Sequence, residues 1–391
     1  MLAAANSMIP LSLYIHIPWC EKKCPYCDFN SHVAGSEVDE PAYVNALQMD
    51  LQCDLQSFAK LISNRKLQSI FIGGGTPSLF SAASISRILA GVADQIGFCD
   101  DIEITLEANP GSAEADKFVE FKQAGINRLS IGVQSFNNTH LSALGRVHDQ
   151  AQAIRAANYA KKAGFNNFNL DLMFGLPGQS NEQSLSDIDQ ALALNPSHLS
   201  CYQLTIEPNT LFHHQPPITP DDEELWQMQL NLQSVLARSN FKQYEVSAYS
   251  LPTQQCRHNL NYWQFGDYLG IGAGAHGKLS DCAAGVYRNW KIKHPATYLK
   301  RSKDGNDLCG ATTKIDSDQL AFEFMLNALR LSNGFKLDLF EQRTGLSINQ
   351  IEPQLDLHQE QQLITVSNQR VSLTSRGKMM VDNMLQDYLS D

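Results

Sequence analysis

Seven short runs of β-branched and aromatic residues alternate with longer amphipathic stretches up to about residue 250, and this rhythm constrains the fold most strongly. Strands that are joined by helical crossovers of this length lie parallel, so the pattern predicts an α/β sheet or barrel. The predicted strands are residues 13–17, 69–73, 102–108, 128–134, 168–174, 199–205 and 244–250.

Polar or conformationally special residues follow six of these strands. The first strand leads to Cys20, the second enters the run GGGTP (73–77), and the fifth carries Asp171. The third, fourth and sixth strands carry or lead to Glu107, Gln134 and Glu207, respectively. Because parallel barrels keep their chemistry at the carboxyl ends of the strands, we expect a functional site at this rim.

Three cysteines lie within the stretch YIHIPWCEKKCPYCDFNSH (14–32), where Cys20, Cys24 and Cys27 have the spacing C-x3-C-x2-C. The chain has nine cysteines, and the other six are scattered, which argues against an extracellular disulfide framework. A structural zinc ion would need a fourth ligand, for which His16 or His32 is available. An iron–sulfur cluster would keep one iron open for a small molecule. The spacing alone leaves both metals open.

The cysteine spacing, with Tyr26 directly before the last cysteine, resembles the signature of radical S-adenosylmethionine (SAM) enzymes. In that superfamily three thiolates hold a [4Fe–4S] cluster, and SAM binds the fourth iron. The run GGGTP matches the glycine-rich element of the superfamily, and it lacks the lysine of a nucleotide-triphosphate loop. The missing fourth cysteine is then a requirement of cofactor binding.

Further motifs between about Ser12 and Lys278 are together similar to the HemW family of haem chaperones, which is related to oxygen-independent coproporphyrinogen III dehydrogenase. These motifs are FIGGGTPS, EANPG, RLSIGVQSF, NLDLMFGLPGQS, YQLTIEPNT, HNLNYW and GIGAGAHGK. The resemblance implies a partial (β/α)6 radical SAM barrel, a cluster, SAM and haem, without an assigned catalytic residue. It also implies SAM contacts from Tyr14, Tyr26, Gly74, Gly75, Thr76, Glu107, Gln134, Arg146 and Asp171.

His258 opens the stretch HNLNYW (258–263), which the HemW family associates with haem binding. Imidazole is a common axial ligand of haem iron, and Tyr262 and Trp263 have flat rings that suit a porphyrin face. We therefore expect His258 to be a haem ligand. Cys256 and His276 are weaker candidates.

Two departures distinguish this chain from the dehydrogenase. The dehydrogenase carries a further cysteine two residues after the last cluster ligand, where this chain has Phe29, and its longer N-terminal extension is missing. Both features favour a haem chaperone. Radical decarboxylation of the propionates of coproporphyrinogen III remains the alternative, because both functions use the same cluster and a tetrapyrrole.

The chain is predicted to have three parts. Residues 1–250 form the barrel with the cluster loop, residues 251–310 form a connecting segment with the haem motif and a glycine-rich turn, and residues 311–391 form a further module. In this last part, three helical patterns precede a hairpin that turns at Ser367–Asn368 and a closing helix, which predicts a winged-helix-like fold. Its acidic composition favours packing or docking to a partner.

Composition limits the partners. The formal charge of −11, without a lysine- or arginine-rich block, argues against a nucleic-acid partner. The first residues have neither a basic region nor a long apolar run, so we expect no signal peptide, no membrane span and a cytoplasmic location. The resemblance implies delivery of haem to membrane or respiratory haem proteins, and it leaves a homodimer open.

Overall fold

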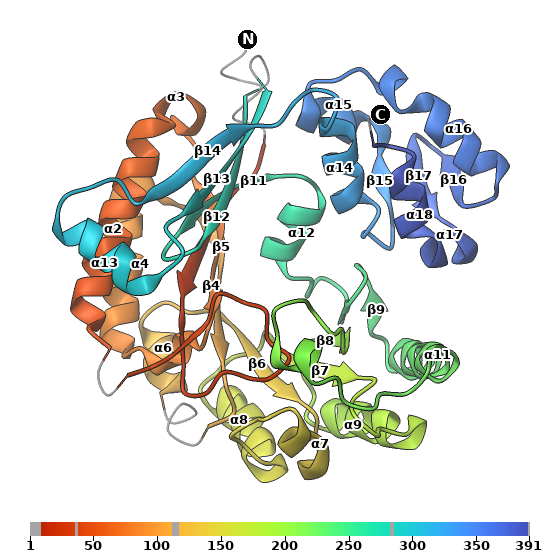
Figure 1. Cartoon of the computed structure of the whole chain (residues 1–391), viewed down its shortest axis with the longest axis horizontal. Helices are drawn as coiled ribbons and strands as arrows, with labels where there is room; N and C mark the ends of the chain where they lie inside the picture. Colours follow the sequence, from red (N-terminus) through yellow and green to blue (C-terminus); the bar gives the residue numbers. More distant parts are fainter. Residues whose placement is uncertain (1–8, 36–37, 112–116, 282–284, 390–391) are drawn as a thin grey trace.

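A twelve-stranded sheet organises most of the computed structural model, which describes residues 9–35, 38–111, 117–281 and 285–389. The strand order is β14-β13-β12-β11-β1-β4-β5-β6-β7-β8-β10-β9, and the sheet curves into a partial barrel (Figure 1). Six neighbouring strands form the middle of this sheet, namely β1 (Leu11–Ile17), β4 (Leu67–Gly74), β5 (Phe98–Ala108), β6 (Arg128–Gln134), β7 (Phe168–Phe174) and β8 (His198–Gln203). These six strands are parallel, which confirms the predicted fold class.

Helices cover the outer face of the barrel strands (Figure 1). Three of the longer helices begin with a capping box, in which Asp149, Ser180 and Asp221 each accept a hydrogen bond from the backbone three residues later. The helices are α2 (Glu40–Ser57), α3 (Ala59–Ile62), α4 (Ala82–Ile96), α6 (Phe118–Gln123), α7 (Asn138–Ala143), α8 (Gln150–Lys162), α9 (Asn181–Ala193), α10 (Leu211–His214) and α11 (Asp222–Arg238), with a 3-10 turn η1 (Pro77–Leu79). Among the described helices, none combines the length and apolarity needed to cross a membrane.

The barrel strands are apolar on one face and polar on the other. Leu129, Ile131 and Leu170 are fully buried in the main hydrophobic core. Their strand neighbours Ser130 and Asp171 instead line a cavity inside the barrel. Because successive side chains of a strand point to opposite faces, this alternation gives the barrel a polar interior.

The prediction of a further parallel strand at residues 244–250 was wrong. Residues 244–250 contribute only the short strand β10 (Ala248–Ser250), which pairs antiparallel with β8 and with the edge strand β9 (Lys242–Gln243). The reason is that β9 and β10 form a hairpin at the sheet edge, and the returning arm of the hairpin takes the position beside β8.

Residues 251–310 form more regular structure than a connecting segment. β11 (Asp267–Ile271) adds a parallel strand beside β1, and β12 (His276–Asp281), β13 (Gly285–Lys291) and β14 (Cys309–Lys314) extend the sheet antiparallel. The HNLNYW stretch lies in helix α12 (Arg257–Trp263), on the concave side of the sheet (Figure 1). A further helix, α13 (Pro295–Lys303), contacts α2.

The C-terminal module has its own hydrophobic core, which also takes in Phe265 and Val286 of the barrel part. The hairpin turns through Asn368 and Gln369, both with positive φ, one residue later than predicted. The predicted closing helix is broken at Met380 into α17 and α18. The elements are α14 (Leu320–Ala328), β15 (Phe335–Lys336), α15 (Leu337–Thr344), η2 (Ile348–Gln350), α16 (Glu352–Glu360), β16 (Ile364–Ser367), β17 (Arg370–Leu373), α17 (Ser375–Met379) and α18 (Val381–Gln386).

Candidate cofactor and ligand sites

The cysteine loop follows β1 and lies at the carboxyl rim of the barrel. Cys20 ends β2 (Trp19–Cys20), which pairs with β3 (His32–Val33), and the Cys27 N–H donates to the Cys24 carbonyl at 3.2 Å. All three cysteines are free thiols. They line one cavity of about 310 Å³ together with the ends of the barrel strands. The fold therefore brings the three cysteine side chains to the rim that the strand pattern indicated.

The thiols lie in a surrounding that favours their neutral form without a bound cation. Burial raises the pKa of Cys20 and of Cys27, although the Ser31 hydroxyl near Cys27 opposes the second shift. Since a metal ligand must be the thiolate, binding of a positive iron centre would supply the missing stabilisation. The donor set fits such a centre.

The same geometry tests the zinc alternative. Among the described residues, no three His, Cys, Asp or Glu side chains converge on one metal ion. His16 uses its two ring nitrogens on the Tyr14 hydroxyl and the Asn30 carbonyl, and His32 bonds to Asn30. The hydrogen bonds of both histidines therefore do not support either of them as the fourth ligand of a zinc ion.

The glycine run packs directly against the cysteine loop. The Gly75 and Thr76 N–H groups donate to the carbonyls of Ile17 and Trp19 at 2.8 and 2.7 Å. A Cβ atom on Gly75 would lie 2.5 Å from the Trp19 carbonyl oxygen, so a side chain there would push the two segments apart. Gly74 has a φ of +113°, which other residues rarely adopt.

Two acids line the cavity on neighbouring sides. Glu107 accepts a hydrogen bond from the Gly74 N–H at 3.0 Å, and burial, followed by the charge of Asp171, raises its pKa to about 7. Asp171 accepts hydrogen bonds from Ser130 and Asn169 at 2.9 and 2.8 Å. Burial raises the pKa of Asp171 as well, and these hydrogen bonds oppose the shift. The two carboxyls are suited to hydroxyl or ammonium groups of a ligand.

Arg146 connects the strand ends to the cysteine loop. Its guanidinium donates to the Asn109 side chain at 2.7 Å, to the Gly132 carbonyl at 2.8 Å and to the Cys24 sulfur at 3.6 Å. Asn109 in turn donates to the Thr76 hydroxyl at 2.9 Å. Asn109 belongs to the motif EANPG but was not among the predicted site residues.

The structure brings most of the predicted SAM contacts into this one cavity. Tyr14 is the exception, because its ring lines a neighbouring cavity instead. The predicted contacts that line the cysteine cavity are Tyr26, Gly74, Gly75, Thr76, Glu107, Gln134, Arg146 and Asp171.

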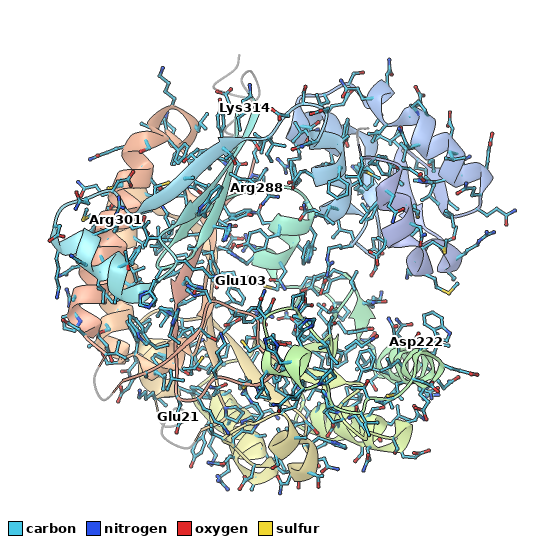
Figure 2. The ribbon with its side chains drawn as sticks, viewed as in Figure 1. Glu21, Glu103, Asp222, Arg288, Arg301 and Lys314 are labelled. Atoms are coloured by element: carbon cyan, nitrogen blue, oxygen red, sulfur yellow. The ribbon has the colours of Figure 1, made fainter. Side chains whose placement is uncertain are left out.

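The neighbouring cavity is larger, with a volume of about 640 Å³, and it lies between the barrel, α12 and the C-terminal module. It shares Phe29, Gly74 and Glu107 with the cysteine cavity, so the two adjoin. Figure 2 shows Arg288 on the sheet, on the side that faces α12. The aromatic lining includes Tyr14, Phe71, Tyr262, Trp263, Tyr268 and Trp290, and basic residues of the lining include Arg288 and Lys293.

His258 lines the larger cavity, but both of its ring nitrogens have protein partners. Nδ1 lies 3.0 Å from the Ser69 hydroxyl, and Nε2 lies 2.9 Å from the Tyr262 hydroxyl one helical turn away. Burial, followed by the charge of Arg128, lowers the pKa of His258 to about 3, which keeps the ring neutral. Iron ligation through Nε2 would require the Tyr262 hydroxyl to move. His276 lines the same cavity with an exposed side chain.

Comparisons with known proteins agree with this arrangement. The Radical SAM superfamily description matches residues 14–191, and the HemN C-terminal domain description matches residues 315–380. The protein is therefore a radical SAM protein with a HemN-type C-terminal domain. It is 48% identical to the heme chaperone HemW of Haemophilus influenzae, over 98% of both chains. It is 46% identical to that of Escherichia coli, over 98% of this chain and 99% of that one. The chain belongs to the HemW family, as its motifs predicted.

A solved structure supports the fold independently. Coproporphyrinogen III oxidase (HemN) from Escherichia coli matches with a TM-score of 0.80, over 99% of this chain and 92% of that chain. The two sequences are 23% identical, so the likeness concerns the fold.

Proposed function

We propose that the protein is a haem chaperone that carries a SAM-ligated [4Fe–4S] cluster and delivers haem to haem-requiring membrane or respiratory proteins from the cytoplasm. The observation that supports this most is the large aromatic cavity beside the cysteine cavity. Its volume of about 640 Å³ suits a ligand of drug size or larger. Flat rings favour a porphyrin face, and cations favour its propionates.

The cluster would be held by Cys20, Cys24 and Cys27, with an open iron for the amino and carboxylate groups of SAM. Arg146 suits a ligand carboxylate, because a guanidinium forms two parallel hydrogen bonds to such a group. Glu107 and Asp171 suit the ribose hydroxyls and the ammonium group. When bound, the cluster and SAM supply one-electron chemistry in radical SAM proteins, and the chaperone function does not require that chemistry.

Two histidines compete for the role of axial haem ligand. His258 belongs to the predicted haem motif, whereas His276 has the more accessible ring, since His258 is 1% exposed. We retain His258 as the proposed ligand. On haem binding, its Nε2 atom would give up the hydrogen bond to the Tyr262 hydroxyl and bind iron instead.

Haem titration of the anaerobically reconstituted protein tests the function. We expect a saturable haem spectrum and transfer of haem to an acceptor apoprotein, without decarboxylation of coproporphyrinogen III under reducing conditions. His258→Ala should shift the haem spectrum and weaken haem retention, whereas the exposed His214→Ala should leave both unchanged. A shift in His276→Ala and none in His258→Ala would move the ligand assignment to His276. Decarboxylation by the parent protein would replace the chaperone function by the dehydrogenase function.

A further inference from the structure

Arg128 is a buried cation without a direct partner. Arg128 is the first residue of β6, and only 2% of its surface is exposed. Among the described residues, its guanidinium makes no hydrogen bond and no ion pair within 4.0 Å, and its Nε atom is buried without an acceptor. It interacts through space with Cys256, Glu103, Tyr244 and Asp171, although none of these forms a hydrogen bond or a close ion pair with it. Because an unpaired buried charge is costly, such a group calls for an explanation.

Its acidic neighbour Glu103 is already committed to the backbone. Glu103 lies near one end of α12 (Figure 2), and its carboxylate accepts hydrogen bonds from the Arg257 and His258 N–H groups, both at 3.2 Å. Glu103 therefore caps the first turn of α12 instead of pairing with Arg128.

Arg128 lines an inner chamber of about 240 Å³ within the barrel. The chamber shares Glu107, Ser130, Asp171 and Tyr202 with the cysteine cavity. It shares Phe71, Glu107, Asn259 and Trp263 with the larger aromatic cavity. The inner chamber thus adjoins both cavities.

The unsatisfied groups of this chamber are donors. The Trp263 indole N–H is buried and lacks an acceptor, as does the Arg128 Nε–H. The polar groups around them bond to one another. Asn169 donates to Ser130 at 2.8 Å, and its side-chain oxygen lies 2.7 Å from the His198 ring. Two donors without acceptors, one of them cationic, match a ligand that brings an acceptor and a negative charge.

We propose that the inner chamber receives a carboxylate of the ligand in the aromatic cavity, a propionate of the tetrapyrrole, with Arg128 as its cationic partner and the Trp263 N–H as a second donor. The inference rests on the proposed haem function. A propionate is a carboxylate on a short flexible arm, which suits a small chamber beside a larger one. Glu107, with its pKa raised to about 7, can carry a proton beside the incoming carboxylate, which reduces their repulsion.

A comparison of haem with haem dimethyl ester tests the assignment, because esterification removes the charge of the propionates. Haem affinity of Arg128→Met should fall roughly 10- to 100-fold, the cost of losing a charged hydrogen bond. The ester should bind the variant and the parent equally. Arg155→Met, at an exposed position of α8, is the matched control and should bind both ligands like the parent.

Each outcome bears on a distinct claim. A folded Arg128→Met that binds haem as tightly as the parent would overturn the inference, because water alone would then satisfy the chamber. Equal loss for haem and its ester would also overturn it, since Arg128 would then act only through the structure. If the variant does not fold, the parent still decides, because equal affinity for haem and the ester would contradict any propionate partner. A parent that binds neither ligand would overturn the proposed function itself.

Discussion

The two large cavities of the protein are built in different ways. The cysteine cavity takes its polar groups from the loop of residues 20–31 and from the ends of consecutive parallel strands, so each group lies next to a recognisable motif. The aromatic cavity takes its lining from β1, β4, α12, β11 to β13 and helix α14 of the C-terminal module, which lie far apart in the sequence. A site at one shared strand edge can be predicted from sequence motifs, whereas a site assembled from distant elements cannot.

The electrostatics differ in the same way. In the cysteine cavity, burial shifts the pKa values of Glu107, Asp171 and two cysteines toward their neutral forms. In the aromatic cavity, two lysines of the lining are neutralised by buried acids, Lys278 by Asp267 and Lys291 by Asp50. The cysteine cavity therefore suits a ligand that brings its own charge. The aromatic cavity presents mainly flat apolar surface and a few accessible cations.

The largest expected effect concerns the cluster. Cys24→Ser should reduce iron and sulfide from about four each per chain to background after anaerobic reconstitution, because a hydroxyl is a poor substitute for a thiolate. Haem binding in the aromatic cavity should persist. Cys53→Ser, in the middle of α2, is the control and should keep its iron. Retention of full iron by Cys24→Ser, or tight zinc in the parent, would contradict the cluster assignment.

The next effect concerns pH. Glu107 has a folded-state pKa of about 7 against an ordinary value of 4.5, so the folded protein holds this proton more tightly than the unfolded chain. The stability that the protonated group contributes is complete below pH 4.5 and is lost as the pH rises through 7. Between these values the free energy of unfolding of the parent should fall by up to roughly 3 kcal/mol more than that of Glu107→Gln. Parallel curves from urea titrations of the apo proteins would show that Glu107 has an ordinary pKa.

SAM binding should respond less strongly. Asp171→Asn removes the charge while keeping the side-chain volume, and SAM affinity should fall roughly 10- to 150-fold, the cost of a charged hydrogen bond. Iron content should stay at the parent level. Equilibrium dialysis with SAM provides the measurement, and Asp189→Asn, on the exposed side of α9, provides the control. Unchanged affinity in Asp171→Asn would remove this residue from the site.

The smallest effect concerns the wall of the aromatic cavity. Arg288 of β13 pairs with Glu323 of α14, and both side chains are partly exposed. Glu323→Gln should lower the free energy of unfolding by at most about 1 kcal/mol, because the apolar core around Phe324 does most of the docking. Asp356→Asn on α16 should have no measurable effect. A loss of several kcal/mol in Glu323→Gln would show that the ion pair, and not the apolar core, holds the module in place.

Local periodicity and short motifs were enough to predict the alternation of strands and helices, the residues at the carboxyl rim of the strands and the family, and they also supplied the cysteine-ligand proposal. These features follow from local periodicity and from motifs, in which neighbouring residues act together. β6 and β7 have the predicted bounds because apolar and polar residues alternate along both strands and the helices between them have side-chain caps. The rim assignments of Glu107 and Asp171 follow from the same periodicity.

Tertiary structure alone decided the direction of β10, the partners of His258 and the position of Tyr14 in the aromatic cavity. It also decided that Arg128 lines an inner chamber and that its buried Nε atom has no acceptor within hydrogen-bond distance. The physical reason is that these properties depend on contacts between elements distant in sequence. The ring of His258, for example, meets Ser69 of β4 only because α12 packs on the concave side of the sheet. No local pattern carries that information.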